Sequence, residues 1–291
     1  MVEAFKFQIV RGDELTGALS NELAAVFSSS YGKWSVDVPP PRKPGGQIRM
    51  KADVYRRWYA RSEYRFALCR TEEGRLIGQA VYIELSTSRG KIAFVVQLVV
   101  DEGHRHQGIA TSLLHSIWGF SDYYAWGIVT SSSCTIEALE GATFRRGVPA
   151  RIAQDADFLR TELFSKIEFL KSAAWTLSDE VSYIDTQFFT DRTHVISGRS
   201  NVPARYGALP SGQEWLSVIF RDQSPTQLDS FAGVIARSSQ IVADAYRRMP
   251  QSSQPWSRKA KDEIDTILSF AYRACGYHCC KQLLRRKRIN C

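Results

Sequence analysis

Long hydrophobic runs are absent from this sequence of 291 residues. A helix that crosses a membrane needs about 20 consecutive apolar residues, and no run here approaches that length. The first ten residues, MVEAFKFQIV, lack the profile of a secretory signal. We therefore expect a cytoplasmic protein that does not enter membranes. Its content of 44% hydrophobic and 23% charged residues is typical of a globular chain.

The cysteines do not form the pattern of a disulfide framework. There are six, at positions 69, 134, 275, 279, 280 and 291. Cys275 to Cys280, together with His278, form one dense group within an apparent helix. Zinc sites usually combine two Cys/His pairs separated along the chain, and no second pair lies upstream. Because cysteines at helical spacing are commonly buried apolar residues, we expect no metal site.

The excess of positive charge, +8 in total, is concentrated at the C-terminus. Residues 1–150 hold 18 Lys/Arg and 15 Asp/Glu, and residues 151–280 hold 15 of each. The last eleven residues carry five cations and no acid: Lys281, Arg285, Arg286, Lys287 and Arg288. One interpretation is a solvated helix end whose cations suit the C-terminal dipole. The other is a contact with nucleic acid or another polyanion.

The stretch from Lys91 to Trp118 organises the chain. Ile92 to Val100 has the length and apolar character of a strand buried on both faces. A polar turn follows, and from Gly108 onward apolar residues recur at helical spacing. The first turn of a helix has backbone N–H groups without intrahelical partners, and the helix dipole adds partial positive charge there. This arrangement predicts a site for an anion, and a pyrophosphate is the ligand that we expect.

The segment Arg105-His106-Gln107-Gly108-Ile109-Ala110 resembles a known signature. It is similar to the Arg/Gln-x-x-Gly-x-Gly/Ala motif of the GCN5-related N-acetyltransferases (GNAT), with the required strand before it and helix after it. The resemblance covers residues 1–150 and implies acetyl-CoA as co-substrate. It also implies an α/β fold with a mixed, mostly antiparallel sheet flanked by helices.

The resemblance also implies which residues bind the cofactor. The backbone from Arg105 to Thr111 should bind the pyrophosphate. Backbone groups of Leu98, Val99 and Val100 should bind the pantetheine arm and polarise the thioester carbonyl. Ser132 stands where the family has an asparagine, and its hydroxyl can offer a weaker hydrogen bond. The alternative is that Ser132 only caps the helix that follows, and both roles are compatible.

The sequence offers two candidate residues for handling the acceptor amine and its proton. Many members of the family have a glutamate on the central strand, but Phe94 to Val100 contains only Gln97, which can orient an amine without removing a proton. Glu84 is the nearest carboxylate and a second candidate, although an exposed charge at a strand end is the favoured explanation for it. The tyrosine that protonates the leaving thiolate in the family has no counterpart in residues 136–140.

Patterning predicts the remaining elements. We expect strands at residues 5–10, 63–70, 75–85, 124–130, 183–189 and 215–221. We expect helices at residues 14–27, 50–61, 135–140, 157–171, 226–248 and 257–288. The Pro/Gly-rich residues 28–47 must form a loop, which by analogy with the family could cover the amine site or be a plain surface connection.

The sequence therefore predicts a GNAT-like acyltransferase domain at residues 1–150 and an additional C-terminal α+β region at residues 151–291. The C-terminal region could be a partner surface, a substrate cover or a module for forming a homodimer. The predicted reaction is direct transfer of an acetyl group to the amine of a small molecule or protein. A non-catalytic acetyl-CoA sensor and a nucleic-acid-associated protein that uses the basic tail are the alternatives.

Overall fold

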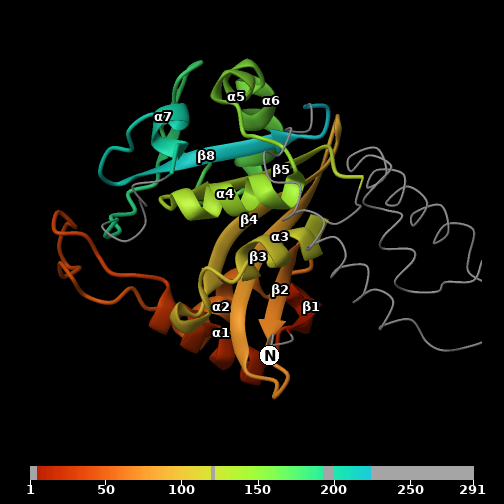
Figure 1. Ribbon diagram of the computed structural model, residues 1–291, viewed down its shortest axis with the longest axis vertical. Helices are drawn as coiled ribbons and strands as arrows, with labels where there is room; N and C mark the ends of the chain where they lie inside the picture. The colour runs from red at the N-terminus through yellow and green to blue at the C-terminus, as the bar shows by residue number, and fades with distance from the viewer. Residues whose placement is uncertain (1–4, 119–121, 193–199, 224–291) are drawn as a thin grey trace, which may run out of the picture. The chain divides into compact units, whose positions relative to one another are not determined.

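The computed structural model of the protein describes residues 5–118, 122–192 and 200–223, all within one compact unit of residues 1–226 (Figure 1). The helices predicted at 226–248 and 257–288 lie outside these residues. So do the cysteine-rich group at 275–280 and the basic tail at 281–291.

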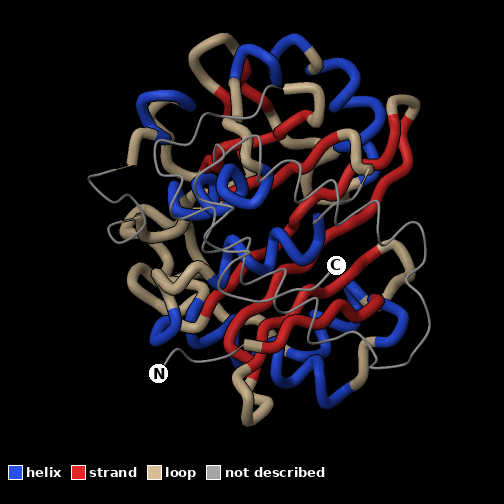
Figure 2. Tube along the Cα trace, turned by 45° about the vertical axis from the view of Figure 1, so that its right-hand side comes forward, coloured by secondary structure: helices blue, strands red, loops and turns tan. Residues whose placement is uncertain are grey.

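A single eight-stranded sheet forms the centre of this unit, in the order β1-β2-β3-β4-β5-β8-β7-β6. Figure 2 shows these strands as one continuous twisted surface. Only β4 and β5 pair in parallel, and every other neighbouring pair is antiparallel. The predicted fold class, a mixed and mostly antiparallel sheet flanked by helices, is confirmed. The strands are β1 Lys6–Arg11, β2 Tyr64–Arg70, β3 Leu76–Thr87, β4 Gly90–Val100, β5 Ala125–Thr130, β6 Trp175–Leu177, β7 Ser182–Asp185 and β8 Gln213–Phe220.

Helices cover both faces of the sheet. On one face, α1 (Gly17–Ser30) and α2 (Ala52–Tyr59) bury Phe27 and Tyr55 against Phe66 and Val81. On the other face, α3 (Ile109–Trp118) packs against β2, β3 and β4, and α4 (Ser133–Thr143) packs against β5 and β8; Figure 1 shows both helices crossing in front of the sheet. Each of these helices turns an apolar stripe toward the strands, which explains the helical periodicity of the sequence, while the choice of face was not predicted.

The helix predicted at residues 157–171 was wrong as a single regular element. The segment is helical only in short turns: α6 (Ala156–Phe158), a π-helical turn (Leu159–Leu163) and a 3₁₀ turn (Phe164–Lys166). Leu163 and Phe164 are both buried, and the wide turn brings these consecutive side chains against the sheet. Periodicity does not distinguish this geometry from a regular helix.

Other elements differ more modestly from expectation. β7 ends at Asp185, well before residue 189, and Gln187 beyond it has a positive φ of 54°. The short helices α5 (Pro149–Gln154) and α7 (Val202–Tyr206) and the three-residue strand β6 were not predicted. Elements of this length carry too few residues for a periodic signal.

The sheet continues across residue 150. Its strands β6, β7 and β8 all come from the later part of the chain, and β8 pairs with β5 along the whole of that strand, from Ala125↔Phe220 to Thr130↔Trp215. Residues 151–223 thus share a sheet with the predicted acyltransferase domain, while the division of roles between 1–150 and 151–291 stays a prediction. None of the described helices has the length and apolar character of a membrane span.

Candidate acetyl-CoA and acceptor site

The strands β4 and β5 separate part-way along the sheet. They pair only from Ile92↔Ala125 to Val95↔Ile128. Beyond that point β4 pairs with β3 alone, and β5 pairs with β8 alone. A register shift at Val81↔Gln97 and Tyr82↔Val95 leaves Val96 as an extra residue, and such a bulge bends its strand. The predicted pantetheine-binding residues, Leu98 to Val100, therefore lie on an open edge of β4.

The predicted phosphate loop connects this open edge to α3. After a 3₁₀ turn, His106 and Gly108 adopt positive φ values of 62° and 78°, and Ile109 begins the helix. The first helical hydrogen bond runs from Ser112 N to Gly108 O at 2.9 Å. No acceptor within the described residues bonds the backbone N–H groups of residues 106–111. An added Cβ at Gly108 would meet no atom within 4 Å, so the space in front of the loop is open.

Arg105 fixes this loop from the side of α1. Its guanidinium donates hydrogen bonds to the carbonyls of Val100 and Ser30. Asp101 bonds His104 at 2.6 Å, and its backbone N–H bonds the Ile77 carbonyl at 2.8 Å. No carboxylate among the described residues pairs with Arg105, so its positive charge remains beside the loop.

Ser132 lies at the end of β5, across the open edge from the phosphate loop. It is the N-cap of α4, and its hydroxyl accepts a hydrogen bond of 3.3 Å from Thr135 N. The capping role is thus confirmed. Because the hydroxyl accepts this bond, its own proton is still available to a ligand. The neighbouring Ser131 shares a hydrogen bond of 2.9 Å with Thr190.

The central part of this arrangement matches a known family. Residues 33–118, from the loop before α2 to the end of α3, match the model of the acetyltransferase (GNAT) family. Residues 33–118 form a GNAT domain.

Solved structures of acetyltransferases are similar to the chain only weakly. A ribosomal-protein-alanine N-acetyltransferase from Brucella melitensis is 18% identical, with 39% of this chain and 70% of that chain covered and a TM-score of 0.29. A variant of the SpeG spermidine N-acetyltransferase from Vibrio cholerae is 9% identical over 74% and 93%, with a TM-score of 0.34. The Escherichia coli YhbS protein in complex with CoA is 18% identical over 45% and 66%, with a TM-score of 0.30. No curated protein sequence matches the chain.

Gln97 belongs to a buried polar cluster on the α1 and α2 face of the GNAT domain. Its carboxamide oxygen accepts hydrogen bonds from the Tyr55 hydroxyl and, at 2.9 Å, from Gln79 Nε2. Gln79 Nε2 also bonds the Tyr55 hydroxyl. Burial raises the pKa of Tyr55 well above its ordinary value, so this phenol stays protonated. Among the described residues, the only partner of the Gln97 amide nitrogen is the sulfur of Met50, at 3.9 Å, so this nitrogen can still donate to a stronger acceptor.

Glu84 lies on the opposite face of the sheet from Gln97. It pairs across the ladder with Ala93, and its carboxylate accepts a hydrogen bond from the Tyr123 hydroxyl and faces Arg65 at 3.6 Å. The structure therefore does not bring the two predicted catalytic residues together. The sequence could not show this, because the bulge at Val96 changes which residues of β4 face α1.

A buried carboxylate that the sequence analysis missed lies at the start of β8. Glu214 is only 8% exposed, and Thr186 Oγ1 donates a hydrogen bond of 2.8 Å to its Oε2. Burial raises the pKa of this carboxyl to about 7, against the lowering effects of Thr186, Arg192 and the Ser131 backbone. The predicted strand begins one residue after Glu214, at Trp215, so this acid lay outside the predicted element.

The Pro/Gly-rich loop before α2 is held against a segment far along the chain. Trp34 forms an isolated bridge with Thr190, Ser35 N bonds the Phe189 carbonyl at 2.9 Å, and Asp191 N bonds the Lys33 carbonyl at 2.8 Å. The ring of Phe188 lies edge-on to Tyr31 and Trp34, at centroid distances of 5.8 and 5.4 Å. Residues 33–35 of the loop are therefore held against residues 189–191, and the role of the loop over an amine site stays a prediction.

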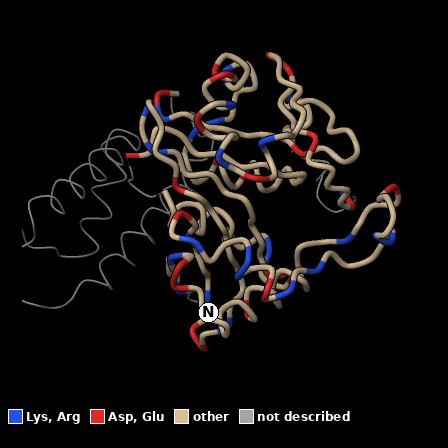
Figure 3. The backbone as a smooth tube through the Cα atoms, turned by 180° about the vertical axis from the view of Figure 1, so that it is seen from behind, with Lys and Arg blue, Asp and Glu red and all other residues tan. Residues whose placement is uncertain are grey.

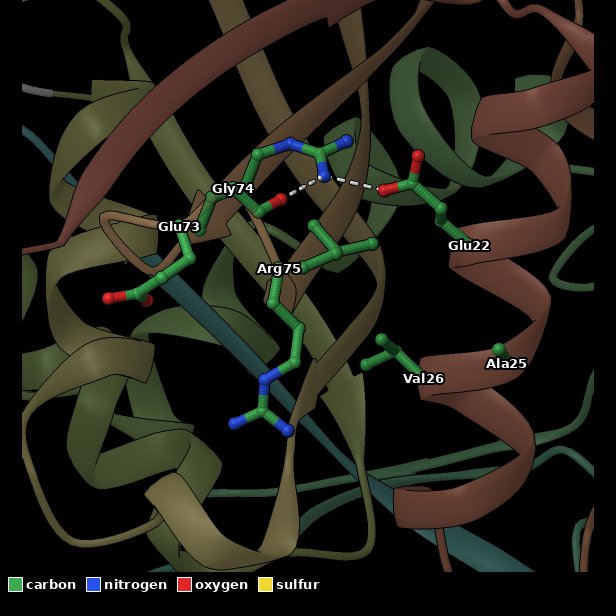
Figure 4. A pocket seen from close by; sticks show the side chains of 8 residues that line it. Glu22, Ala25, Val26, Glu73, Gly74 and Arg75 are labelled. Atoms are coloured by element: carbon green, nitrogen blue, oxygen red, sulfur yellow. Dashed lines mark hydrogen bonds and ion pairs between the residues drawn. The ribbon is translucent and has the colours of Figure 1, made fainter.

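A surface pocket of about 460 Å³ lies apart from these groups, between α1 and the turn that joins β2 to β3 (Figure 4). In it Arg70 pairs with Glu22 at 2.5 Å and bonds the Gly74 carbonyl at 2.8 Å. Arg75 projects into the space and reaches His104 at 3.2 Å. None of the residues predicted to bind acetyl-CoA lines this pocket, so we do not assign the site to it.

Proposed function

We propose that this protein transfers an acetyl group from acetyl-CoA to an amine by direct attack of the amine on the thioester. The observation that carries the proposal is the loop at residues 105–111. It places the backbone N–H groups of residues 106–111, which no acceptor among the described residues bonds, at the start of α3, directly beside the open edge of β4, within a GNAT domain. Diphosphates bind such helix N-termini because the N–H groups and the helix dipole both favour negative charge.

Each part of the co-substrate has a matching set of groups in this proposal. The backbone of Arg105, His106, Gln107, Gly108, Ile109, Ala110 and Thr111 binds the diphosphate. The open edge at Leu98, Val99 and Val100 binds the pantetheine arm. The Ser132 hydroxyl donates a hydrogen bond to the same arm. Gln97 orients the amine through its carboxamide, while Glu84 serves as an ion-pair partner of Arg65. The chemistry that acetyl-CoA supplies is an activated acyl carbon with a thiolate leaving group.

The positive charge of residues 33–61, the loop before α2 and α2 itself, affects which acceptor molecules fit. Residues 33–61 carry eight cations and two acids, a net of +6, and Figure 3 shows them spread along the loop and α2. The eight cations are all exposed: Lys33, Arg42, Lys43, Arg49, Lys51, Arg56, Arg57 and Arg61. Such a surface attracts anions and repels polycations. An acceptor with a carboxylate or phosphate near its amine therefore fits better than a polyamine or an aminoglycoside.

Calorimetric titration with acetyl-CoA, followed by thiol detection with a panel of amines, tests the proposal. The panel comprises glutamate, phosphoethanolamine, an acidic peptide with a free N-terminus, a lysine peptide and spermidine. Binding followed by amine-dependent thiol release supports an acetyltransferase. Binding without release across the panel supports the alternative, a non-catalytic sensor. Absence of binding contradicts both.

The nucleic-acid alternative has one further observation in its favour, since the exposed cations of residues 33–61 are interleaved with aromatic side chains. Arg42 lies over the Trp34 ring at 4.8 Å, and the Trp58 side chain is 51% exposed. Bases stack on such exposed aromatic groups. Binding that falls steeply with salt, and that survives removal of residues 281–291, would assign nucleic acid to this surface and not to the basic tail.

A further inference from the structure

Glu214 lies beyond the end of β5, beside the predicted pantetheine site. β8 runs antiparallel to β5, and its Trp215 pairs with Thr130, the last residue of that strand. Glu214 precedes Trp215, and the Ser131 backbone is near enough to its carboxyl to lower the pKa of that group. Ser131 in turn precedes Ser132. The carboxylate is therefore at the point where β5 ends and the cofactor-side segment begins.

Glu214 and Gln97 point to the same side of the sheet from the two separating strands. Side chains two residues apart share a face, so Glu214 lies on the face of Val218. Val218 and the ring of Phe94 both lie against Gly127 on this face. Phe94 pairs with Ile83, and Ile83 shares its face with Val81, the partner of Gln97.

Tyr31 connects the two positions. This tyrosine ends α1, and its pKa is raised by burial and by the negative charge of Glu214. Tyr31 also acts on Tyr55, which bonds Gln97. Tyr31 thus lies near enough to both Glu214 and the Gln97 cluster for charge to act between them, and the ring of Phe188 packs against both Tyr31 and Trp34.

We propose that Glu214 is the general base that accepts the proton of the acceptor amine. The assignment rests on the proposed acetyltransferase function. No Lys or Arg among the described residues forms an ion pair with Glu214, and Thr186 is its one side-chain hydrogen-bond donor there. A carboxylate oxygen with a single donor still has lone pairs for a substrate N–H. Within the described part of the chain, no Lys or Arg lies within 4 Å to hold this buried carboxylate in its charged form.

The electrostatic surroundings suit this role. Burial raises the pKa of Glu214 to about 7, and the charged or titratable groups that act on it are Arg192 and Tyr31. Arg192 donates its Nη hydrogens to the carbonyls of Leu209, Pro210 and Gln213, so it is held in place without an ion pair to the acid. A base whose pKa lies near the working pH is largely deprotonated and still has a high affinity for the proton that it accepts.

The proposed transfer forms one carbon–nitrogen bond and breaks one carbon–sulfur bond. The amine nitrogen forms a bond to the thioester carbonyl carbon, and the carbon–sulfur bond breaks with its electron pair on sulfur. The proton that leaves nitrogen goes to a Glu214 oxygen. The thiolate takes a proton from solvent, and Glu214 returns its proton to solvent before the next turnover. The products are one amide and one free thiol.

The test compares Glu214→Gln with the wild-type protein in the thiol-release assay, using the amine of the panel that is turned over. We expect kcat to fall about 100- to 1000-fold at pH 7.5, with acetyl-CoA affinity changed by less than about threefold. The wild-type profile of kcat against pH should show a limb near pH 7, and the variant should lack it. A Glu214→Gln protein that keeps its kcat within about threefold and keeps the limb overturns the assignment.

A second variant tests the assignment even if Glu214→Gln fails to fold. Thr186→Val removes a hydrogen bond that lowers the pKa of Glu214 and leaves the carboxylate in place. We expect the limb to move to higher pH, and an unmoved limb overturns the assignment. Glu168→Gln, an exposed acid paired with Lys171, is the matched control and should leave the profile unchanged. If the wild type itself releases no thiol with any amine, the proposed function fails first, and this inference fails with it.

Discussion

Arg205 donates hydrogen bonds to both carboxylate oxygens of Glu140, at 2.7 Å to Oε1 and 2.9 Å to Oε2. The same carboxylate accepts the backbone N–H of Gly147 at 2.9 Å. Both side chains are largely buried, with 20% and 13% exposed. This pair joins α7, from the later part of the chain, to α4 beside the predicted cofactor site.

Arg205→Ala should lower the free energy of unfolding by about 2 kcal/mol, because Glu140 would be left buried with only one donor. Urea denaturation followed by circular dichroism measures the change. Lys171→Ala is the control, since its partner Glu168 is 88% exposed, and it should change stability by less than about 0.5 kcal/mol. Equal effects of the two variants would contradict this account of the buried pair.

A fragment of residues 1–150 should not fold cooperatively. Without β8, the outer edge of β5 loses its antiparallel partner, and buried residues such as Ala125 and Ile128 become exposed. The measurement is thermal unfolding of the fragment beside the full chain, with hydrogen exchange of the β5 amides. A sharp transition and protected β5 amides in the fragment would show that residues 1–150 are an independent domain.

Gly108→Glu should weaken acetyl-CoA binding at least about tenfold, since a negative charge would enter the space that the diphosphate needs. Gly74→Glu is matched to it, because Gly74 also has a positive φ, of 91°, and open space around its Cβ position. Calorimetry on the two variants separates charge at the loop from backbone strain. Comparable losses of affinity in both would argue against a diphosphate at residues 105–111.

Gly127→Ala should destabilise the protein by about 1–3 kcal/mol through overpacking. A Cβ at this position of β5 would lie 2.5 Å from the Phe94 ring and 3.5 Å from Val218. Gly103→Ala, whose nearest neighbour would be Asp101 at 3.6 Å, should have little effect on the urea midpoint. Unchanged stability in Gly127→Ala would mean that β4 and β5 are not packed as described.

Glu214→Gln should change the pH dependence of stability. The folded carboxyl has a pKa of about 7 against an ordinary value of 4.5, so between these values the folded protein holds a proton that the unfolded chain has lost. Stability should therefore fall as pH rises through this window and level off above pH 7, by about 3 kcal/mol for this one group. Glutamine does not titrate, so the free energy of unfolding of the variant, measured by urea denaturation, should increase relative to that of the wild type from pH 5 to pH 8. Parallel curves would contradict the burial of Glu214.

Local patterns were sufficient to predict the elements up to α4. The strand, turn and helix around Gly108 were readable because buried strands, amphipathic helices and a glycine with positive φ each leave a signal within a few residues. The capping role of Ser132 followed from its place before the short helix. The order of the first strands was predictable as well, since short turns such as residues 71–74 force neighbouring strands to pair.

The contributions from beyond residue 150 could not be predicted in the same way. β8 reaches β5 across more than 80 residues, and no local pattern states which strand it joins. The opposite orientations of Glu84 and Gln97 depend on the extra residue at Val96, which shifts the alternation of β4. Glu214 is inconspicuous in sequence because its significance comes from burial and from Thr186, Arg192 and Ser131, which are distant along the chain.

The bridge between Trp34 and Thr190 has an implication for how this protein can diversify. The proposed diphosphate loop and residues 33–35 beside the proposed amine site lie in separate stretches, and residues 189–191 bond residues 33–35 while no hydrogen bond among the described residues joins them to residues 105–111. Under the proposed function, replacement of that short downstream stretch would reshape the acceptor side and leave acetyl-CoA recognition intact. Relatives that share residues 33–118 but differ near position 190 are the natural place to look for a change of substrate.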